Sequence, residues 1–295
     1  MRGAHARSGV PGAWRPTLAI VETQQIIQSL SYITWVLLGS LALGSFALTW
    51  LLRQVTDAAA GFLGFSAFLA GLTGLAWLAT DWGLPLPSEL AIESGAALDE
   101  PRRAAIALFV ALSILASFRM RRGGEARWLG VVAVAAGVAA LALAAGGWAG
   151  GEPLAVPLLV QLLALAVVTG GSMAAVVLAH WYLVTPRISE RPLVLSTRIL
   201  FWAIVVQLLL YGTWLATGTP GGEPFAALTG PNAAFVWLRL VVGLLFPLAL
   251  VWMAWKTALS RSMESATGLL YIEFALVMAS TIVASGLALA EGLLV

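Results

Sequence analysis

Eight long apolar stretches divide the 295-residue sequence, and they constrain the fold more than any other feature. A helix needs about 20 apolar residues to cross a hydrocarbon core ~30 Å thick. The stretches cover residues 30–52, 58–80, 103–118, 129–148, 155–183, 194–217, 234–258 and 267–291. Backbone polar groups find no water inside a bilayer, so such segments are expected to be helical. The sequence therefore predicts an all-α, polytopic membrane bundle of about eight transmembrane helices.

The low charge content indicates that the apolar region forms one unit. Charged residues make up only 10% of the sequence, whereas soluble proteins carry about 25%. No charged segment is long enough to fold as a separate globular domain. We therefore expect a single transmembrane helical domain over residues 30–295, preceded by an N-terminal tail over residues 1–29. Within the tail, residues 17–29 suit an interfacial helix that leads into the first span.

The distribution of basic residues predicts the orientation, because cytoplasmic loops of membrane proteins are enriched in arginine and lysine. An outer N-terminus would place these basic residues on the cytoplasmic side: Arg53, Arg119, Arg121, Arg122, Arg127, Arg187, Arg191, Arg198, Lys256 and Arg261. The basic tail, with Arg2, Arg7 and Arg15, argues for the reverse orientation. The larger group favours both termini on the outer side of a bacterial cytoplasmic membrane.

The sequence contains no complete catalytic, metal or nucleotide motif, and its composition excludes several cofactors. Cysteine is absent, so the chain has no thiolate ligands for zinc or iron–sulfur clusters. A membrane haem b would need two axial ligands, while the only histidines are His5 in the tail and His180 in the fifth span. We therefore expect no intrinsic cofactor and no metal site. The net charge of only +2 gives no indication of nucleic-acid binding.

A cluster of polar and aromatic residues is predicted near the cytoplasmic ends of the fifth, sixth and eighth spans. Its members are His180, Tyr182, Arg187, Arg191, Arg198, Tyr271 and Glu273. Ionisable groups at membrane depth are costly and frequently functional. Histidine and arginine can donate to quinone carbonyl oxygens, and a carboxylate can exchange the accompanying protons. Arginine equally suits a lipid phosphate. The sequence therefore predicts a quinone or phospholipid site here.

A purely structural interpretation of the same residues also stands. The aromatic side chains would form an interfacial belt, and the histidine would make a hydrogen bond near the interface. Glu273 would then pair with an arginine such as Arg198 and fix the packing of the helices. Small-residue spacings such as Ser40/Gly44 and Gly170/Ala174 are typical of close helix packing in membranes.

The longest predicted outer connection, residues 81–101, is rich in acidic side chains. Its acids are Asp81, Glu89, Glu93, Asp99 and Glu100. Clustered negative charge attracts cationic partners, so these residues are candidates for docking a periplasmic protein. The alternative is a solvated loop with a short surface helix around residues 88–97.

The features together favour an integral membrane subunit of a respiratory or photosynthetic electron-transfer complex. Such a subunit would anchor other membrane or periplasmic chains, bind membrane lipids, and be auxiliary rather than a stand-alone enzyme. One alternative is a transporter or permease, which needs a polar path through the bilayer midplane. The sequence places Thr169, Ser172, Gln207 and Ser280 there, without an ionisable residue. Two further alternatives are a non-catalytic scaffold or lipid-binding accessory subunit, and a membrane enzyme that acts on lipid.

Overall fold

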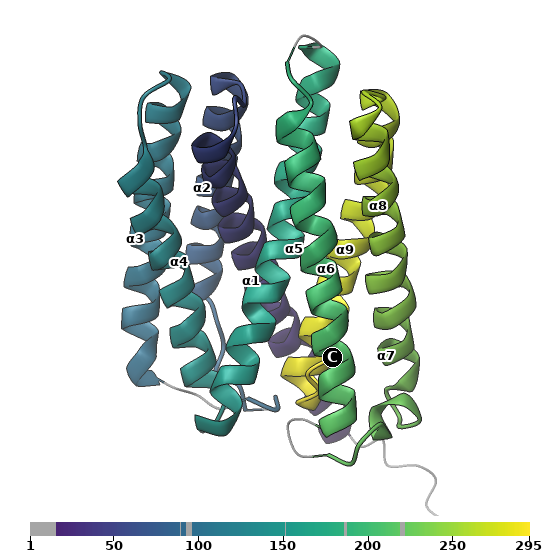
Figure 1. The fold of residues 1–295 in the computed structure, drawn as a ribbon. Helices are drawn as coiled ribbons and strands as arrows, with labels where there is room; N and C mark the ends of the chain where they lie inside the picture. The colour runs from purple at the N-terminus through teal and green to yellow at the C-terminus, as the bar shows by residue number, and fades with distance from the viewer. Residues whose placement is uncertain (1–15, 89, 93–95, 151, 186–187, 219–221) are drawn as a thin grey trace, which may run out of the picture.

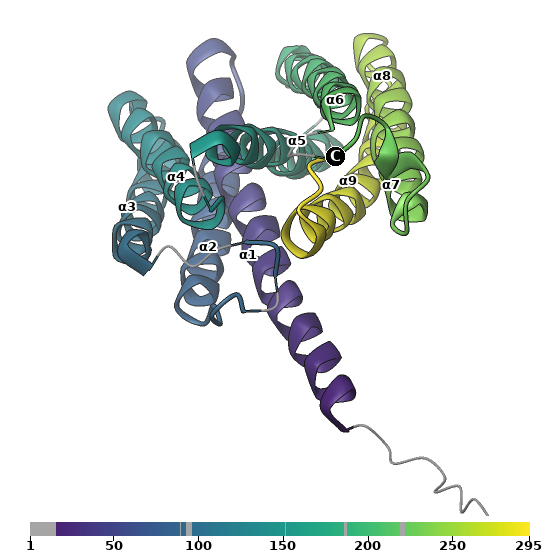
Figure 2. The same cartoon turned by 90° about the horizontal axis from the view of Figure 1, so that it is seen from below.

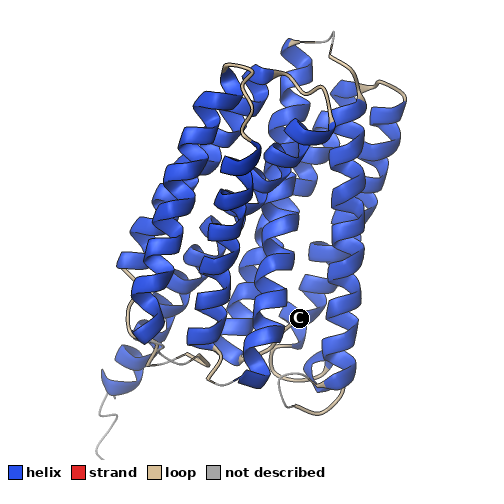
Figure 3. Ribbon diagram, turned by 60° about the vertical axis from the view of Figure 1, so that its left-hand side comes forward, coloured by secondary structure: helices blue, strands red, loops and turns tan. Residues whose placement is uncertain are grey.

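The computed structural model describes residues 16–88, 90–92, 96–150, 152–185, 188–218 and 222–295, and the described residues are helices joined by short connections without strands (Figure 3). The helices are α1 (Pro16–Val55), α2 (Ala60–Trp82), α3 (Ala96–Arg121), α4 (Arg127–Trp148), α5 (Glu152–Val184), α6 (Arg191–Thr217), α7 (Ala233–Leu240), α8 (Phe246–Leu259) and α9 (Met263–Glu291), with a short 3₁₀ turn η1 (Ala226–Leu228). Within these described ranges, eight helical segments are long and apolar enough to cross a membrane. This confirms the predicted polytopic bundle.

The seventh span is a composite of three pieces. Between α7 and α8 lies a π-helical segment, η2 (Val241–Leu245), and the whole span runs from Ala233 to Leu259 without a break. A π segment contains i→i+5 hydrogen bonds and often marks a functional position in a helix. Hydropathy does not predict this irregularity, because the π-helical residues are as apolar as the helices on either side of them.

The helices form two groups that lie side by side (Figures 1 and 2). The first group is a ring of α1, α2, α3 and α4, and the second is a ring of α5, α6, α7–α8 and α9. Helices α1 and α5 pack against each other and join the two groups. Each ring follows the chain order, as expected for antiparallel helices linked by short loops.

Small residues allow α1 and α5 to approach closely. A Cβ atom added at Gly44 would lie 1.8 Å from the carbonyl oxygen of Ala166, and one added at Gly170 would lie 2.3 Å from that of Ser40. Both distances are far below van der Waals contact. The predicted packing role of the small-residue spacings is therefore confirmed at this crossing.

Two local predictions need correction. The segment over residues 17–29, by contrast, is helical and leads into the first span as predicted, and the two form one 40-residue helix. The third helix runs from Ala96 to Arg121, well beyond the predicted 103–118. The expected surface helix over 88–97 does not form at residues 88 and 90–92, which are turn or bend, while 96 and 97 already belong to α3.

The bundle has two chemically different ends. The arginine-rich end contains the turns that follow Val55, Arg121, Val184 and Leu259. The terminal end contains the C-terminus, the beginning of the first span and the loop after Trp82 (Figure 1). In that loop, the backbone N–H of Ala91 donates to the carbonyl of Leu289 on α9 at 2.9 Å, so the loop ties the two rings together.

Candidate functional site

The structure brings together only part of the predicted quinone or phospholipid cluster. His180 on α5 and Tyr271 on α9 lie next to each other, with the imidazole Nδ1 3.3 Å from the phenolic oxygen. Both side chains are exposed on the surface of the bundle. Tyr182 is buried instead, and its hydroxyl donates to the carbonyl of Ser189 at 2.5 Å, closing the turn between α5 and α6.

The predicted arginines do not join this pair. Arg191 and Arg198 are exposed on α6, and Arg187 lies outside the described residues. Among the described residues, neither Arg191 nor Arg198 forms an ion pair with Glu273. Glu273 is fully buried, because residues two apart on a helix point to nearly opposite faces and Tyr271 takes the outer one.

Glu273 belongs to a row of polar contacts between α5 and α9, which we call the polar seam. Its contacts are Ala179 carbonyl with Thr267 Oγ1 (3.1 Å), Ser172 Oγ with Glu273 Oε1 (2.7 Å), Thr169 Oγ1 with Thr281 Oγ1 (2.6 Å), and Gln161 Nε2 with the carbonyl of Val295 (3.1 Å). The six side chains in these contacts are polar and buried, while Ala179 and Val295 contribute only their backbone carbonyls. The row runs along the full length of the second ring.

A buried arginine adjoins the polar seam. Arg239, the next-to-last residue of α7, contacts the hydroxyl of Ser280 and donates to Gln207 Oε1 at 3.2 Å. Ser280 also donates to the carbonyl of Gly243, inside the π segment, at 3.0 Å. A Cβ at Gly243 would lie 2.1 Å from Ser280 Oγ. The irregular turn and its glycine therefore let the seventh span approach α9 at the level of Arg239.

Three polar atoms in this region lack a hydrogen-bond partner among the described protein groups. They are Glu273 Oε2, Arg239 Nε and Gln207 Nε2. The two known partners of Arg239 are uncharged, and so is the known partner of Glu273. Glu273 and Ser280 are seven residues apart, which corresponds to about 10 Å along a helix axis. Among the described residues, the second ring thus holds one acidic and one basic group in its interior, and the two form no direct ion pair.

A hollow lies at each end of the polar seam. At the arginine-rich end, a hollow of about 590 Å³ is lined by Tyr182, Arg261, Met263 and Glu264, one turn from Thr267. At the terminal end, a smaller pocket of about 70 Å³ is lined in part by Trp214 and Val295, and Val295 also accepts the hydrogen bond from Gln161. A recess therefore lies beyond each end of the seam.

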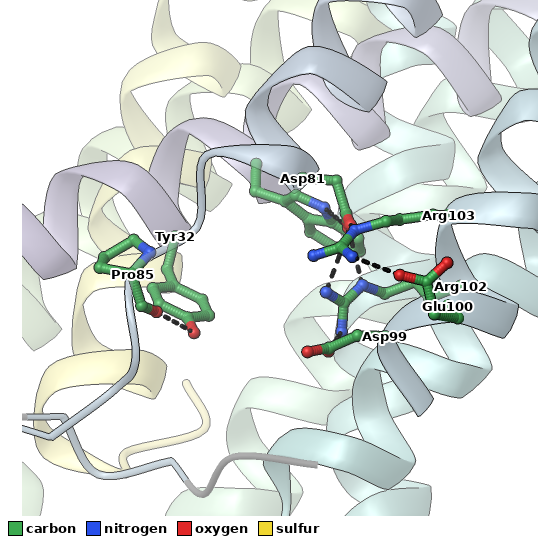
Figure 4. Close-up of polar contacts among 8 residues, drawn as sticks. Tyr32, Asp81, Pro85, Asp99, Glu100, Arg102 and Arg103 are labelled. Atoms are coloured by element: carbon green, nitrogen blue, oxygen red, sulfur yellow. Dashed lines mark hydrogen bonds and ion pairs between the residues drawn. The ribbon is translucent and has the colours of Figure 1, made fainter. Parts of the chain in front are cut away.

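A separate ion-pair network lies at the terminal end of the first ring (Figure 4). Asp81 at the end of α2 is 0% exposed and accepts hydrogen bonds from Trp35 Nε1 at 2.6 Å and Arg102 Nε at 2.7 Å. Arg103 Nε lies 3.2 Å from the other oxygen of Asp81. The two arginines also pair with Asp99 and Glu100, each at 2.8 Å.

This network changes the interpretation of the predicted docking acids. Asp81 is inaccessible to a partner, and Asp99 and Glu100 are each paired with an arginine that Asp81 shares, although Glu100 is 83% exposed. Glu89 and Glu93 lie outside the described residues. The pairs Asp99–Arg102 and Glu100–Arg103 are three apart on one helix, a spacing that favours ion pairs. That spacing was the sequence signal for this network.

Aromatic rings complete the surroundings of Arg102. The guanidinium carbon lies 5.9 Å from the ring centroid of Trp35 and 5.5 Å from that of Trp148. Trp35 also packs edge-on against Trp77 and Trp148. Cation–π contacts of this kind stabilise a desolvated arginine. The network therefore holds the helices of the first ring together at its terminal end.

No family model matches the chain, and no curated protein shows significant similarity to it. Within the part of the chain that the structure describes, no group of three or more histidine or acidic side chains is arranged to hold a metal ion. The polar seam and the His180–Tyr271 pair are the two groups of described residues with candidate chemistry.

Proposed function

We propose that this protein is a membrane transporter that moves protons through its second helical ring, with Glu273 as the central proton-carrying group. The observation that carries the proposal is the position of Glu273. Its carboxyl group is fully buried between α5 and α9, with one oxygen bonded to Ser172 and the other without a protein partner. Carboxyl groups in such places are typical members of proton relays in membrane proteins.

The contacts on either side of Glu273 support a path for protons. Thr267 lies between the carboxyl group and the arginine-rich end, and Ser172 lies beside the carboxyl group. Thr169 and Thr281 continue the seam toward the terminal end. The two threonine hydroxyls are 2.6 Å apart, so no solute fits between them in this packing. Among the described residues no hydrogen bond joins one of these cross-helix pairs to the next, so the proposed path passes the proton from pair to pair through bridging water molecules.

Arg239 supplies a fixed positive charge within the same ring. Placing a single ionised carboxylate in the bilayer interior is costly unless another charge or hydrogen bonds compensate it. At about 10 Å and an effective dielectric constant of ~20, two opposite charges attract by about 1.7 kcal/mol. Arg239 therefore keeps the net charge of the interior near zero whenever Glu273 releases its proton.

Proton flux into vesicles tests the proposal. The purified protein is reconstituted with an internal pH-sensitive dye, and a potassium gradient with valinomycin supplies the driving force. We expect wild-type flux to exceed that of empty vesicles and Glu273→Gln to abolish the excess, because glutamine keeps the size and the hydrogen bond to Ser172 but cannot release a proton. Ser172→Ala should reduce the flux less, since one hydrogen bond contributes only about 1 kcal/mol.

Glu291→Gln is the matched control, because Glu291 lies on the same helix but is exposed at its other end and lines neither hollow. It is expected to conduct like the wild type. Equal flux through Glu273→Gln and wild type would overturn the assignment of Glu273. Wild-type vesicles no leakier than empty ones would overturn proton transport and favour a scaffold or accessory role.

A second candidate function is supported by the His180–Tyr271 pair. We propose as the alternative an electron-transfer subunit that receives a quinone headgroup at this pair, which is exposed on the bundle surface where a membrane-soluble ligand arrives. Partner chains would then carry the redox cofactors. This proposal predicts that native extraction in mild detergent recovers redox partners and quinone, and that His180→Ala lowers quinone-linked turnover with assembly intact. Recovery of the chain alone, free of quinone, would contradict it.

Both functions assume the orientation in which the arginine-rich end faces the cytoplasm of a bacterium, as the positive-inside rule favours. Reporter fusions at the two termini test this assumption. Activity of a periplasm-specific reporter at both ends is the expected result, and a cytoplasmic signal at either end would reverse the direction of the proposed path.

A further inference from the structure

A groove opens on the first ring, apart from the polar seam. It has a volume of about 470 Å³ and lies where α2, α3 and α5 meet near the arginine-rich end. Phe65 and Phe68 of α2 and Phe118 of α3 form its apolar walls, and all three are about half exposed. Arg121, the last residue of α3, lines the same groove.

Two glycines of α2 bring the walls of the groove together. A Cβ at Gly64 would lie 2.6 Å from the Cβ of Arg121, and one at Gly61 would lie 2.9 Å from the ring of Trp181. Trp181 packs against Phe65 with ring centroids 6.3 Å apart. Larger residues at these positions would push α3 and α5 away from α2, so the glycines keep Arg121 and Trp181 close to the apolar walls of the groove.

The mouth of the groove carries excess positive charge. Arg119, Arg121, Arg122 and Arg127 fall within nine residues and are all exposed, while Glu125 is the only acid in that segment. In the described part of the chain, none of these arginines forms an ion pair with a carboxylate. Arg53 adds a further cation, since its Nη2 donates to the carbonyl of Gly123 at 3.0 Å.

We propose that this groove binds an anionic phospholipid from the leaflet at the arginine-rich end. The phosphate contacts Arg121, which can bind it through two parallel hydrogen bonds. One acyl chain lies along Phe65, Phe68 and Phe118 toward the bilayer centre. The surplus of arginines disfavours a choline headgroup, whose cation would meet like charges, and a neutral quinone would leave the guanidinium uncompensated.

Competitive lipid binding to the purified full-length protein tests this site. Native mass spectrometry counts bound lipid from detergent micelles that contain equal amounts of phosphatidylglycerol and phosphatidylcholine. We expect one phosphatidylglycerol to be retained preferentially, and Arg121→Gln to weaken that binding about fivefold, the contribution of one basic residue near a membrane surface. Arg122→Gln is the matched control, because it removes the same charge at the next position, outside the groove lining.

A photoactivatable phosphatidylglycerol locates the bound molecule. We expect its acyl chain to cross-link to peptides that contain Phe65, Phe68 or Phe118, and Arg121→Gln to reduce the yield. Equal retention of the two lipids would overturn the proposal, as would equal weakening by both arginine substitutions, which would mean diffuse attraction without a defined site. Cross-links confined to other helices would also overturn it.

Discussion

Replacing Asp81 with alanine is expected to destabilise the protein by about 3 kcal/mol, because it breaks a buried ion pair and leaves the buried donors of Trp35 and Arg102 without their acceptor. Arg102 is 2% exposed and donates to Asp81 through Nε, so it cannot turn to solvent when its partner is lost. The expected loss lies at the lower end of the usual range, since Asp99 still pairs with Arg102. Unfolding of the protein in mixed micelles, followed by tryptophan fluorescence during titration with a denaturing detergent, measures the loss.

The control for charge alone is Glu223→Gln, which removes one exposed carboxylate outside the network and should leave the unfolding midpoint unchanged. The double variant Asp81→Leu/Arg102→Met should regain part of the lost stability, because apolar residues often replace a buried ion pair at little cost. An Asp81→Ala protein as stable as the wild type would show that the network does not support the first ring.

The sequence was sufficient to predict the number of spans and their approximate limits. Length and hydropathy determine both, since a helix of a given length either crosses the hydrocarbon core or does not. The beginning of α3 was missed for a definite reason. The predicted span starts at residue 103 because the apolar run starts there, whereas the helix starts at Ala96 and its first turns carry the ion pairs of Arg102 and Arg103 with Asp81, Asp99 and Glu100.

The candidate site was only partly predictable, because depth along a helix follows from the sequence while the facing of each helix does not. His180 and Tyr271 were expected at one level and do meet. Glu273 was placed in the same layer, but the rotation of α9 turns it inward to Ser172. The sequence shows that Arg239 and Gln207 are polar residues inside two different apolar spans. Their contact required knowledge of which helices are neighbours.

The second large effect is expected at the crossing of α1 and α5. Gly170→Ala should destabilise the protein by about 3 kcal/mol, the upper part of the range for overpacking, because the new methyl group would collide with backbone atoms on α1 that cannot rotate away. These are the carbonyl oxygen of Ser40 and the backbone N of Ser45, 2.3 and 2.5 Å from the added Cβ. Gly44→Ala should behave in the same way, since its Cβ would meet the carbonyl of Ala166.

The matched control is Gly212→Ala on α6, where an added Cβ meets nothing within 4 Å. That substitution should leave stability unchanged or raise it by up to about 1 kcal/mol, because alanine favours the helix over glycine. The same detergent titration compares the three variants. If Gly170→Ala and Gly212→Ala have equal midpoints, the two rings are not held by the close approach of α1 and α5.

The wide turn at Val241–Leu245 has a consequence for how the seventh span presents its side chains. An i→i+5 turn holds one surplus residue compared with an α-helical turn. Each residue advances an α-helix by about 100°, so everything beyond Leu245 is out of phase with Ala233–Leu240 by roughly that angle. Residues four or seven positions apart therefore do not stay on one face across this turn. The face of α8 that points toward α9 cannot be found by extending the spacing from Arg239 to Lys256. A heptad count across the whole span would assign half of it to the wrong neighbour.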